Sequence, residues 1–229
     1  LTNDVVGLSV SGVTFASGAN AFTLAGNALS LGGNVVNSAT TPQVINFGLI
    51  LTGTRTITAG AGPIAIGGVI SDGGAGYGLV KAGAQILSLT GLNTFGGDVT
   101  HSVGTLSIAG IGTGTTGAPT AGALGRGTVH LGGGTLTSSA AATIYNNVDV
   151  QSGTTTAITR AVANLTLAGN LSGSGTITES GTNVGGTHFN GDNSGFTGTF
   201  TSSNASGHRV RFNSAAAGSA AATWVLNNS

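Results

Sequence analysis

Charged side chains are scarce in this chain. Six residues are Lys or Arg and six are Asp or Glu, so that only 5% of the 229 residues carry a charge, against roughly 25% in an average soluble domain. The formal net charge is zero and the isoelectric point is about 7.1. A neutral chain offers no electrostatic basis for binding nucleic acid or an anionic membrane, and charge-based catalysis has few groups available.

Cysteine and methionine are both missing. The lack of cysteine excludes thiol catalysis, disulfide bonds and thiolate metal sites, and it is compatible with a chain that crosses a membrane unfolded during export. No uncharged apolar run reaches the roughly 18 residues that a membrane-spanning helix needs. The sequence opens at Leu1 within a strand-like pattern, so we expect it to be part of a longer chain.

Glycine and a two-residue alternation dominate what remains. Because the 43 glycines fall inside nearly every short window and each costs about 1 kcal/mol in a helix relative to alanine, almost no helix is expected. Apolar residues alternate with Ser, Thr and Asn in short segments separated by turn residues, which is the pattern of an all-β protein. These segments lie at 8–15, 22–31, 44–51, 64–66, 86–89, 106–108, 129–131, 148–150, 165–167, 210–212 and 224–226.

Internal repeats indicate which all-β architecture is present. The stretch TLAGNALSLGG at 23–33 is echoed by LTLAGNLSGSG at 165–175, and GTLSI at 104–108 is echoed by GTLTS at 134–138. A short repeat that cannot bury its own apolar face must stack on its neighbours. The sequence therefore predicts one continuous β-solenoid over 1–229, a right-handed parallel β-helix with strands of about 4 to 7 residues and coils of about 20 to 25.

Residues 76–110 carry the strongest repeat, GYGLVKAGAQILSLTGLNTFGGDVTHSVGTLSIAG. Its marked positions are Gly78, Leu79, Lys81, Gly83, Leu87, Leu89, Gly91, Asn93, Phe95, Gly97, Gly104 and Leu106. This pattern resembles the autotransporter-associated β-strand repeat, a passenger-domain repeat of bacterial secreted and surface proteins. Gln85 stands where that repeat usually has glycine and Phe95 where it usually has tyrosine, and a degenerate copy spans about 166–212. The resemblance implies a parallel β-helix displayed outside the cell, usually without a known enzymatic activity.

Isolated basic residues give little reason to expect a site. Lys81 is the single lysine, and a solvent-facing repeat residue is favoured over a Schiff base or a phosphate contact. The histidines at 101, 130, 188 and 208 lack the close spacing of a metal site, so only the stacking of coils would bring them together. His101 is expected to face solvent. We therefore predict no catalytic, cofactor-binding or metal-binding residue.

The acidic residues also come singly. A polysaccharide-cleaving β-helix needs a cluster of acids near a basic residue. Asp72 with Lys81, or Glu179 with Asp192, could meet across coils, but exposed positions near turns are favoured. The glycine-rich stretch 73–78 has no aspartate at the offsets of RTX-type calcium binding. The acidic residues are Asp4, Asp72, Asp98, Asp149, Glu179 and Asp192.

Threonines two residues apart form a further pattern. They occur in TGTRTIT at 52–58, GTTTAIT at 153–159 and FTGTFT at 196–201, and some β-solenoids use such pairs to form flat ice-binding planes. A plane needs the pair at the same position in successive coils, whereas these segments lie roughly 100 and 40 residues apart. We expect a hydrated surface instead, because strand propensity alone favours outward threonine.

Together these features predict a non-enzymatic extracellular structural protein, a rod or fibre at a bacterial cell surface with adhesion as one role. The expected partners are adjacent repeats of the same chain or identical subunits stacked end to end, since the strand edges at both ends need cover. An extracellular glycan is a further candidate partner, and no nucleic acid or cofactor is expected. One alternative is a glycan lyase or hydrolase, which would show three or more ionisable side chains converging in a groove. The other is a carbohydrate- or ice-binding module, which would show a flat face of aligned aromatics or threonines.

Overall fold

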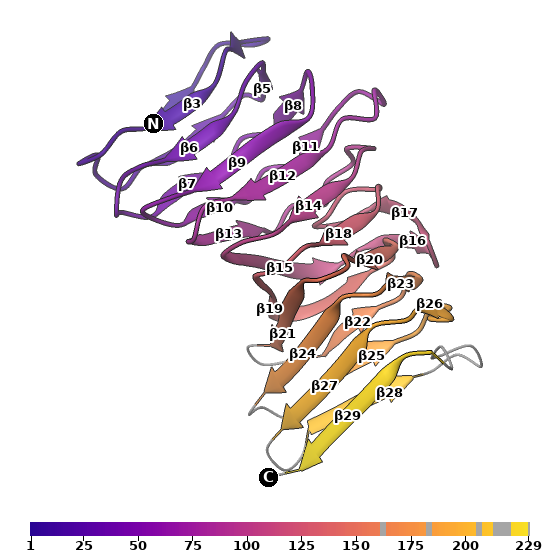
Figure 1. The fold of residues 1–229 in the computed structure, drawn as a ribbon. Coiled ribbons are helices and arrows are strands. Elements are labelled where there is room, and N and C mark those ends of the chain that lie inside the picture. The colour runs from indigo at the N-terminus through magenta and orange to yellow at the C-terminus, as the bar shows by residue number, and fades with distance from the viewer. Residues whose placement is uncertain (161–163, 182–184, 205–207, 213–220, 229) are drawn as a thin grey trace.

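In the computed structural model the chain winds into a parallel β-helix (Figure 1). The structure describes residues 1–160, 164–181, 185–204, 208–212 and 221–228. Within these ranges every regular element is a strand, and all strand pairs are parallel except one hairpin. The expected all-β solenoid is therefore confirmed. In the described part of the chain, no helix is long and apolar enough to cross a membrane.

Three faces form the wall of the tube. The long face consists of β1 (Thr2–Asn3), β4 (Thr23–Gly26), β7 (Gln43–Ile45), β10 (Ile64–Ile66), β13 (Ile86–Leu89), β15 (Thr105–Ile111), β19 (Thr135–Ile144), β21 (Thr155–Arg160), β24 (Thr176–Gly181), β27 (Thr199–Asn204) and β29 (Thr223–Asn228). The short face begins with β2 (Ser9–Val10), β5 (Leu29–Leu31), β8 (Leu49–Leu51) and β11 (Ile70–Ser71). The third face consists of β3 (Val13–Phe15), β6 (Val35–Asn37), β9 (Arg55–Ala59), β12 (Leu79–Ala82), β14 (Val99–His101), β18 (Val129–Leu131), β20 (Val148–Val150), β23 (Leu171–Gly173) and β26 (Gly195–Phe196).

The long face forks at β19. Residues 135–138 of this strand pair with β21, whereas residues 142–144 pair with β22 (Leu165–Leu167). From there β22, β25 (Gly185–Phe189) and β28 (His208–Phe212) stack in turn and follow the long-face strands along each coil. They take the place that the short face holds in the first half of the chain.

The coils are similar in length apart from one insertion. The register partners His130 and Asp149 are 19 residues apart, and the register partners Glu179 and Ser202 are 23 residues apart. One coil is longer, because Asp98 and Thr128, which directly precede the paired strands β14 and β18, are 30 residues apart. The additional residues form the antiparallel hairpin of β16 (Thr113–Thr115) and β17 (Ala118–Ala121). The observed coil length is thus close to the expected one except at this hairpin.

Strand length differs from the expectation. Many strands have only two or three residues, and β19 has ten. Glycines occupy several corners between strands, where stacked coils bring the backbones too close together for a side chain. At Gly83, Gly104 and Gly134 the backbone has φ of +80°, +71° and +68°. A Cβ on Gly104 would lie 2.4 Å from the oxygen of Gly83, and one on Gly134 would lie 2.6 Å from the oxygen of Gly104, so only glycine fits this stacked corner.

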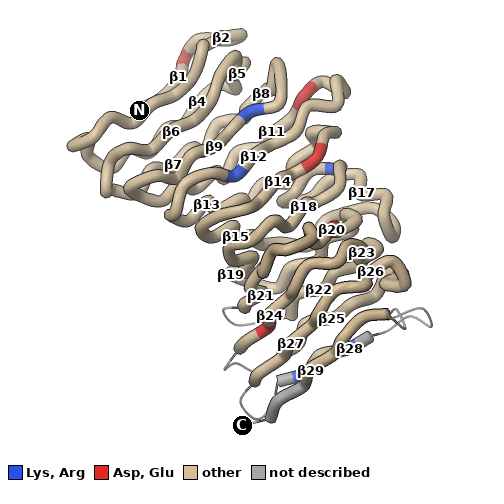
Figure 2. The backbone as a smooth tube through the Cα atoms, viewed as in Figure 1, with Lys and Arg blue, Asp and Glu red and all other residues tan. Residues whose placement is uncertain are grey.

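The interior is a continuous apolar core. Alternate residues of each strand point inward and meet their counterparts in the next coil, as Ile64 meets Leu87; both are at most 1% exposed. Stacked strands lie about 4.8 Å apart, so the nine strands of the third face span roughly 40 Å. The few charged residues are spread along the tube (Figure 2).

Candidate functional site

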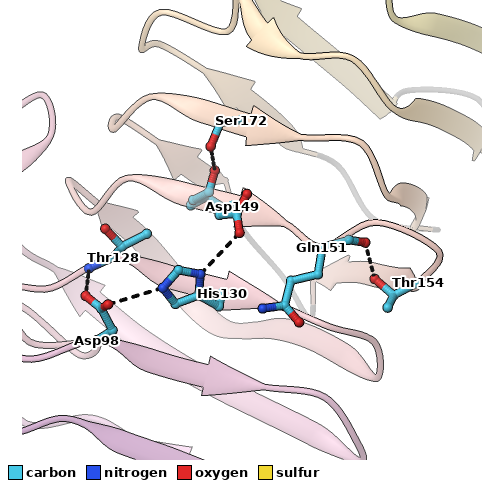
Figure 3. A network of polar contacts seen from close by, with 8 residues as sticks. Asp98, Thr128, His130, Asp149, Gln151, Thr154 and Ser172 are labelled. Carbon is cyan, nitrogen blue, oxygen red and sulfur yellow. Dashed lines mark hydrogen bonds and ion pairs between the residues drawn. The ribbon is translucent and has the colours of Figure 1, made fainter.

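The third face carries a histidine held between two carboxylates (Figure 3). His130 is the middle residue of β18 and the register partner of Asp149 in β20. Its Nδ1 lies 3.2 Å from Oδ2 of Asp149, and its Nε2 lies 3.2 Å from Oδ2 of Asp98, which directly precedes β14. The other oxygen of Asp98 accepts a hydrogen bond from the Thr128 N–H at 2.8 Å. Three successive coils therefore each contribute one ionisable side chain.

Opposing effects set the pKa of His130. Partial burial lowers the pKa, but the hydrogen bonds and negative charges of Asp149 and Asp98 outweigh it and raise the pKa above the usual 6.5. Only the protonated ring donates from both nitrogens at once, so the imidazolium form satisfies both carboxylates. The His130 side chain is 28% exposed, so protons exchange readily with solvent.

Protonated His130 is expected to stabilise the fold. Because its folded-state pKa lies above the unfolded value, its contribution is fully present below about pH 6.5 and is lost as the pH rises through the folded-state pKa. Asp149→Asn removes one of the two negative charges and is expected to lower the pKa of His130. Asp4→Asn, in the first coil, should leave it unchanged. An NMR titration of the His130 ring proton measures both effects, and an unaltered pKa in Asp149→Asn would contradict the pairing.

This cluster does not have the geometry of a hydrolase. The two ring nitrogens point in opposite directions, so Asp98 and Asp149 lie on opposite sides of the imidazole rather than around a common point. In glycoside hydrolases the paired carboxylates flank an open space for sugar and water, whereas here His130 fills that space. Three ionisable groups from adjacent coils are present, as an enzyme would require, but they do not converge. Among the described residues, no group of three His, Cys, Asp or Glu side chains is placed to hold a metal ion.

A shallow groove of about 410 Å³ lies beside Asp98. Asp98 is the one ionisable residue in its described lining, so the groove offers hydroxyl, backbone and carboxylate hydrogen-bonding groups but no acid–base pair. The lining residues are Thr54, Gly76, Gly78, Leu79, Val80, Gly97, Asp98 and Thr100.

Lys81 lies inside the tube, so the expectation that it faces solvent is wrong. Its side chain is 2% exposed, because position 81 is in phase with the inward residue Leu79. Burial lowers the pKa of Lys81 to about 8. Its Nζ donates hydrogen bonds to the carbonyl oxygens of Ala82, Gly83 and Val103 at 3.1, 2.6 and 3.0 Å. The repeat lysine therefore ties together the corner after its own strand and the equivalent corner of the next coil.

His101 is also buried, contrary to expectation. It stacks on Lys81 in the interior of the third face and is fully buried. Its Nε2 lies 3.2 Å from the carbonyl oxygen of Thr135 and donates to it, whereas Nδ1 has no partner among the described residues. Burial, followed by the charge of Lys81, lowers the pKa of His101 to about 4. A neutral histidine is thus built into the core.

Buried His101 is expected to destabilise the protein in acid. The unfolded chain takes up a proton near pH 6.5 but the folded chain does so only near pH 4, so stability falls as the pH drops through this interval. At about 1.4 kcal/mol per pKa unit, the loss is on the order of 3 kcal/mol. His101→Leu, which matches the stacked Leu131, should remove most of this loss. Urea denaturation at pH 7 and pH 4 measures it, and equal pH dependence in both proteins would refute the assignment.

Asp72 is buried in a turn, contrary to the expected surface position. It is 4% exposed and forms no ion pair with Lys81. Burial raises its pKa, but four backbone N–H donors outweigh this effect and lower it. The donors are Gly74, Gly76, Tyr77 and Gly96, at 2.7 to 3.0 Å. Both carboxylate oxygens thus organise the glycine-rich loop 73–78.

Glu179 is buried as well, and its charged partner is Arg160 rather than Asp192. Glu179 is 1% exposed and Arg160 is 5% exposed. Nε of Arg160 lies 3.4 Å from Oε1 of Glu179, and the carboxylate also accepts hydrogen bonds from Thr187 at 2.9 Å and Ser202 at 3.1 Å. This ion pair crosses the interior near the fork in the long face.

The remaining histidines do not join these groups. His188 lies on β25, where burial and then the charges of Arg211 and Arg160 lower its pKa. The side chain of His208 lies outside the described residues. The pairing of His130 with two acids was not foreseen from the sequence.

Comparison with known proteins bears on the family. No family model matches the chain, and no solved structure matches it. The chain is 32% identical over 158 residues to the "Adhesin BmaC autotransporter" of Brucella suis biovar 1 (strain 1330), a match that covers 61% of the chain. This similarity and the β-solenoid fold fit an autotransporter passenger-type repeat protein. The match spans 5% of the length of this relative.

Several marked positions of the repeat at 76–110 have structural roles. Lys81 and Gly83 build the stacked corner, and Phe95 fills the core. Asn93 bridges coils, because its Oδ1 accepts the Ile70 N–H at 2.8 Å and its Nδ2 donates to the Ala123 oxygen at 2.7 Å. The repeat thus encodes the fold itself.

Proposed function

We propose that this chain is a non-enzymatic segment of a surface-displayed bacterial adhesin rod. The observation that carries the proposal is the parallel stack of the described strands, in which several ionisable groups make structural contacts. Lys81, Asp72 and Glu179 bind the chain's own backbone and side chains. The named relative is an autotransporter adhesin, which supports export to the cell surface.

The rod is proposed to continue by stacking. Strand β1 pairs with β4, and its other edge has no partner among the described residues. The side chains of Leu1, Val5 and Val6 beside it are 77%, 52% and 85% exposed. A free strand edge next to apolar side chains favours pairing with another strand. We propose that further coils, from the same polypeptide or from a second copy, cover this edge, and that an extracellular glycan is a candidate surface for adhesion.

Surface labelling tests the proposal. Antibodies raised against this chain should label intact cells of the source organism, and external protease should remove the signal. Labelling that appears only after lysis would contradict surface display. Incubation of the purified chain with a panel of polysaccharides should release no reducing or unsaturated ends, and release that is abolished by His130→Gln would establish the enzyme alternative.

A further inference from the structure

The outward face of the last long-face strands carries a regular set of threonines. Strands β21, β24, β27 and β29 lie side by side along one side of the rod (Figure 1). We call their outward threonines the threonine array. The array consists of Thr155, Thr159, Thr176, Thr178, Thr199, Thr201 and Thr223.

Six of the seven array threonines are stacked in register. One column runs through four successive coils, where Thr176 is the partner of both Thr155 and Thr199, and Thr199 is in turn the partner of Thr223. In a second column Thr178 stacks directly on Thr201. Two neighbouring strands therefore present the same Thr-x-Thr pair one above the other.

This stacking contradicts the sequence-based premise that threonine pairs do not recur at the same position in successive coils. That expectation paired TFT at 199–201 with the distant segment at 153–159, and it missed TIT at 176–178. Glu179 and Ser202, which directly follow TIT and TFT, are register partners 23 residues apart, so that Thr176 meets Thr199 without a shift. The successive strands β24 and β27 thus place threonine pairs at the same position, which is the condition for a threonine plane.

The hydroxyl groups of the array are free to bind a ligand. Their side chains are at least partly exposed, whereas the alternating residues Ile177 and Phe200 are fully buried. Among the described residues, none of the array hydroxyls has a hydrogen-bond partner within the protein. The face is also neutral, because the other outward residues described on these strands are Ala157, Ser180, Ser203 and Val225.

The other faces lack this regularity. In the first half of the long face the outward column runs from Thr23 through Val44 and Ala65 to Ser88. The outward column of the third face mixes aliphatic, hydroxyl and charged side chains, in the order Thr56, Val80, Thr100, His130, Asp149 and Ser172. Strand propensity acts on every face, so it does not explain why threonine concentrates on this one.

The fold makes the array a rigid two-dimensional lattice. Stacked strands are about 4.8 Å apart, and residues two apart on one strand are separated by about 6.7 Å. Threonine is β-branched, so its χ1 is restricted and its methyl and hydroxyl groups keep fixed positions. The array spans roughly 14 Å across four strands. Ordered water molecules bound between these hydroxyl groups would be spaced by the same distances as the threonines.

We propose that the threonine array binds the surface of ice. Ice is a neutral, regular lattice of water molecules, and the array is likewise neutral and presents hydroxyl groups at regular intervals. The methyl groups order neighbouring water, and each hydroxyl both donates and accepts a hydrogen bond. A sugar ligand is less well matched, because the array has no aromatic ring for stacking and no amide or charged side chain. The proposal concerns the chain itself and does not depend on surface display.

Partition into ice tests the proposal. When a dilute solution of the whole chain is slowly frozen onto a cold finger, the chain should be enriched in the ice relative to a non-binding control protein. Thr178→Tyr with Thr201→Tyr should abolish the enrichment, because two rings interrupt the regular rows of threonines. Thr14→Tyr with Thr58→Tyr, at outward positions of the third face, should retain it. Circular dichroism confirms that each variant is folded, and Thr178→Lys serves as a second array variant with the same expected loss.

Several results would overturn the inference. The inference is wrong if the wild-type chain is excluded from ice like the control protein. It is also wrong if the wild type and both folded array variants are equally enriched in the ice. Retention on crystalline cellulose or chitin without enrichment in ice would replace ice with a polysaccharide as the ligand. Each of these outcomes is independent of whether antibodies label intact cells.

Discussion

Glu179→Leu is expected to destabilise the protein by about 3 to 5 kcal/mol, because it leaves Arg160 charged and buried without its carboxylate. Both side chains are enclosed, and Nε of Arg160 lies 3.4 Å from Oε1 of Glu179. The variant also removes the acceptor of the Thr187 and Ser202 hydroxyl groups. Urea denaturation followed by circular dichroism gives the change in the free energy of unfolding.

The matched control is the double variant Arg160→Met with Glu179→Leu. Replacing both members of a buried ion pair with apolar residues of similar volume is often neutral or stabilising. The double variant should therefore recover most of the stability that Glu179→Leu loses. If the single and double variants are equally unstable, the loss comes from packing or from the hydroxyl contacts rather than from an unpaired charge.

Phe95→Ala is expected to lower the free energy of unfolding by about 3 to 5 kcal/mol, because it opens a cavity in a part of the core that is tightly packed. Phe95 is fully buried. A Cβ built on Gly125 would lie 2.6 Å from its ring, so that the next coil packs directly against the phenyl group. The same urea denaturation measures this loss.

Leu92→Ala is the control for Phe95→Ala. Leu92 lies three residues away on the same corner but is 50% exposed, and exposed substitutions usually change stability by less than about 0.5 kcal/mol. Comparable losses in the two variants would show that the corner, rather than the phenyl group, determines stability.

Much of the fold could be predicted from the alternation of residues. A two-residue period identifies inward positions within one strand, and glycine identifies the corners, so the solenoid and its coil length followed from the sequence. The same alternation also places Lys81 and His101 inward, but both were expected to face solvent because polar residues are mostly exposed. Counting in phase from Leu79 and Val99 places both inside, where Lys81 finds three carbonyl oxygens.

The surface clusters could not be predicted, because they depend on the exact length of each coil. His130 is 32 residues from Asp98 and 19 from Asp149, and the difference arises from the hairpin inserted in one coil. Thr178 and Thr201 meet because no insertion separates them. The register between coils decides which side chains become neighbours, and this register cannot be read directly from the sequence.

The register of the stack is the central claim, and spin labelling tests it most directly. The chain has no cysteine, so Thr178→Cys with Thr201→Cys attaches two nitroxides at defined sites, about 5 Å apart across neighbouring strands. We predict strong dipolar broadening of the electron paramagnetic resonance spectrum, and none when Thr178→Cys is combined with Thr14→Cys in the first coils. A doubly labelled spectrum equal to the sum of its two single-label spectra would contradict the parallel in-register solenoid.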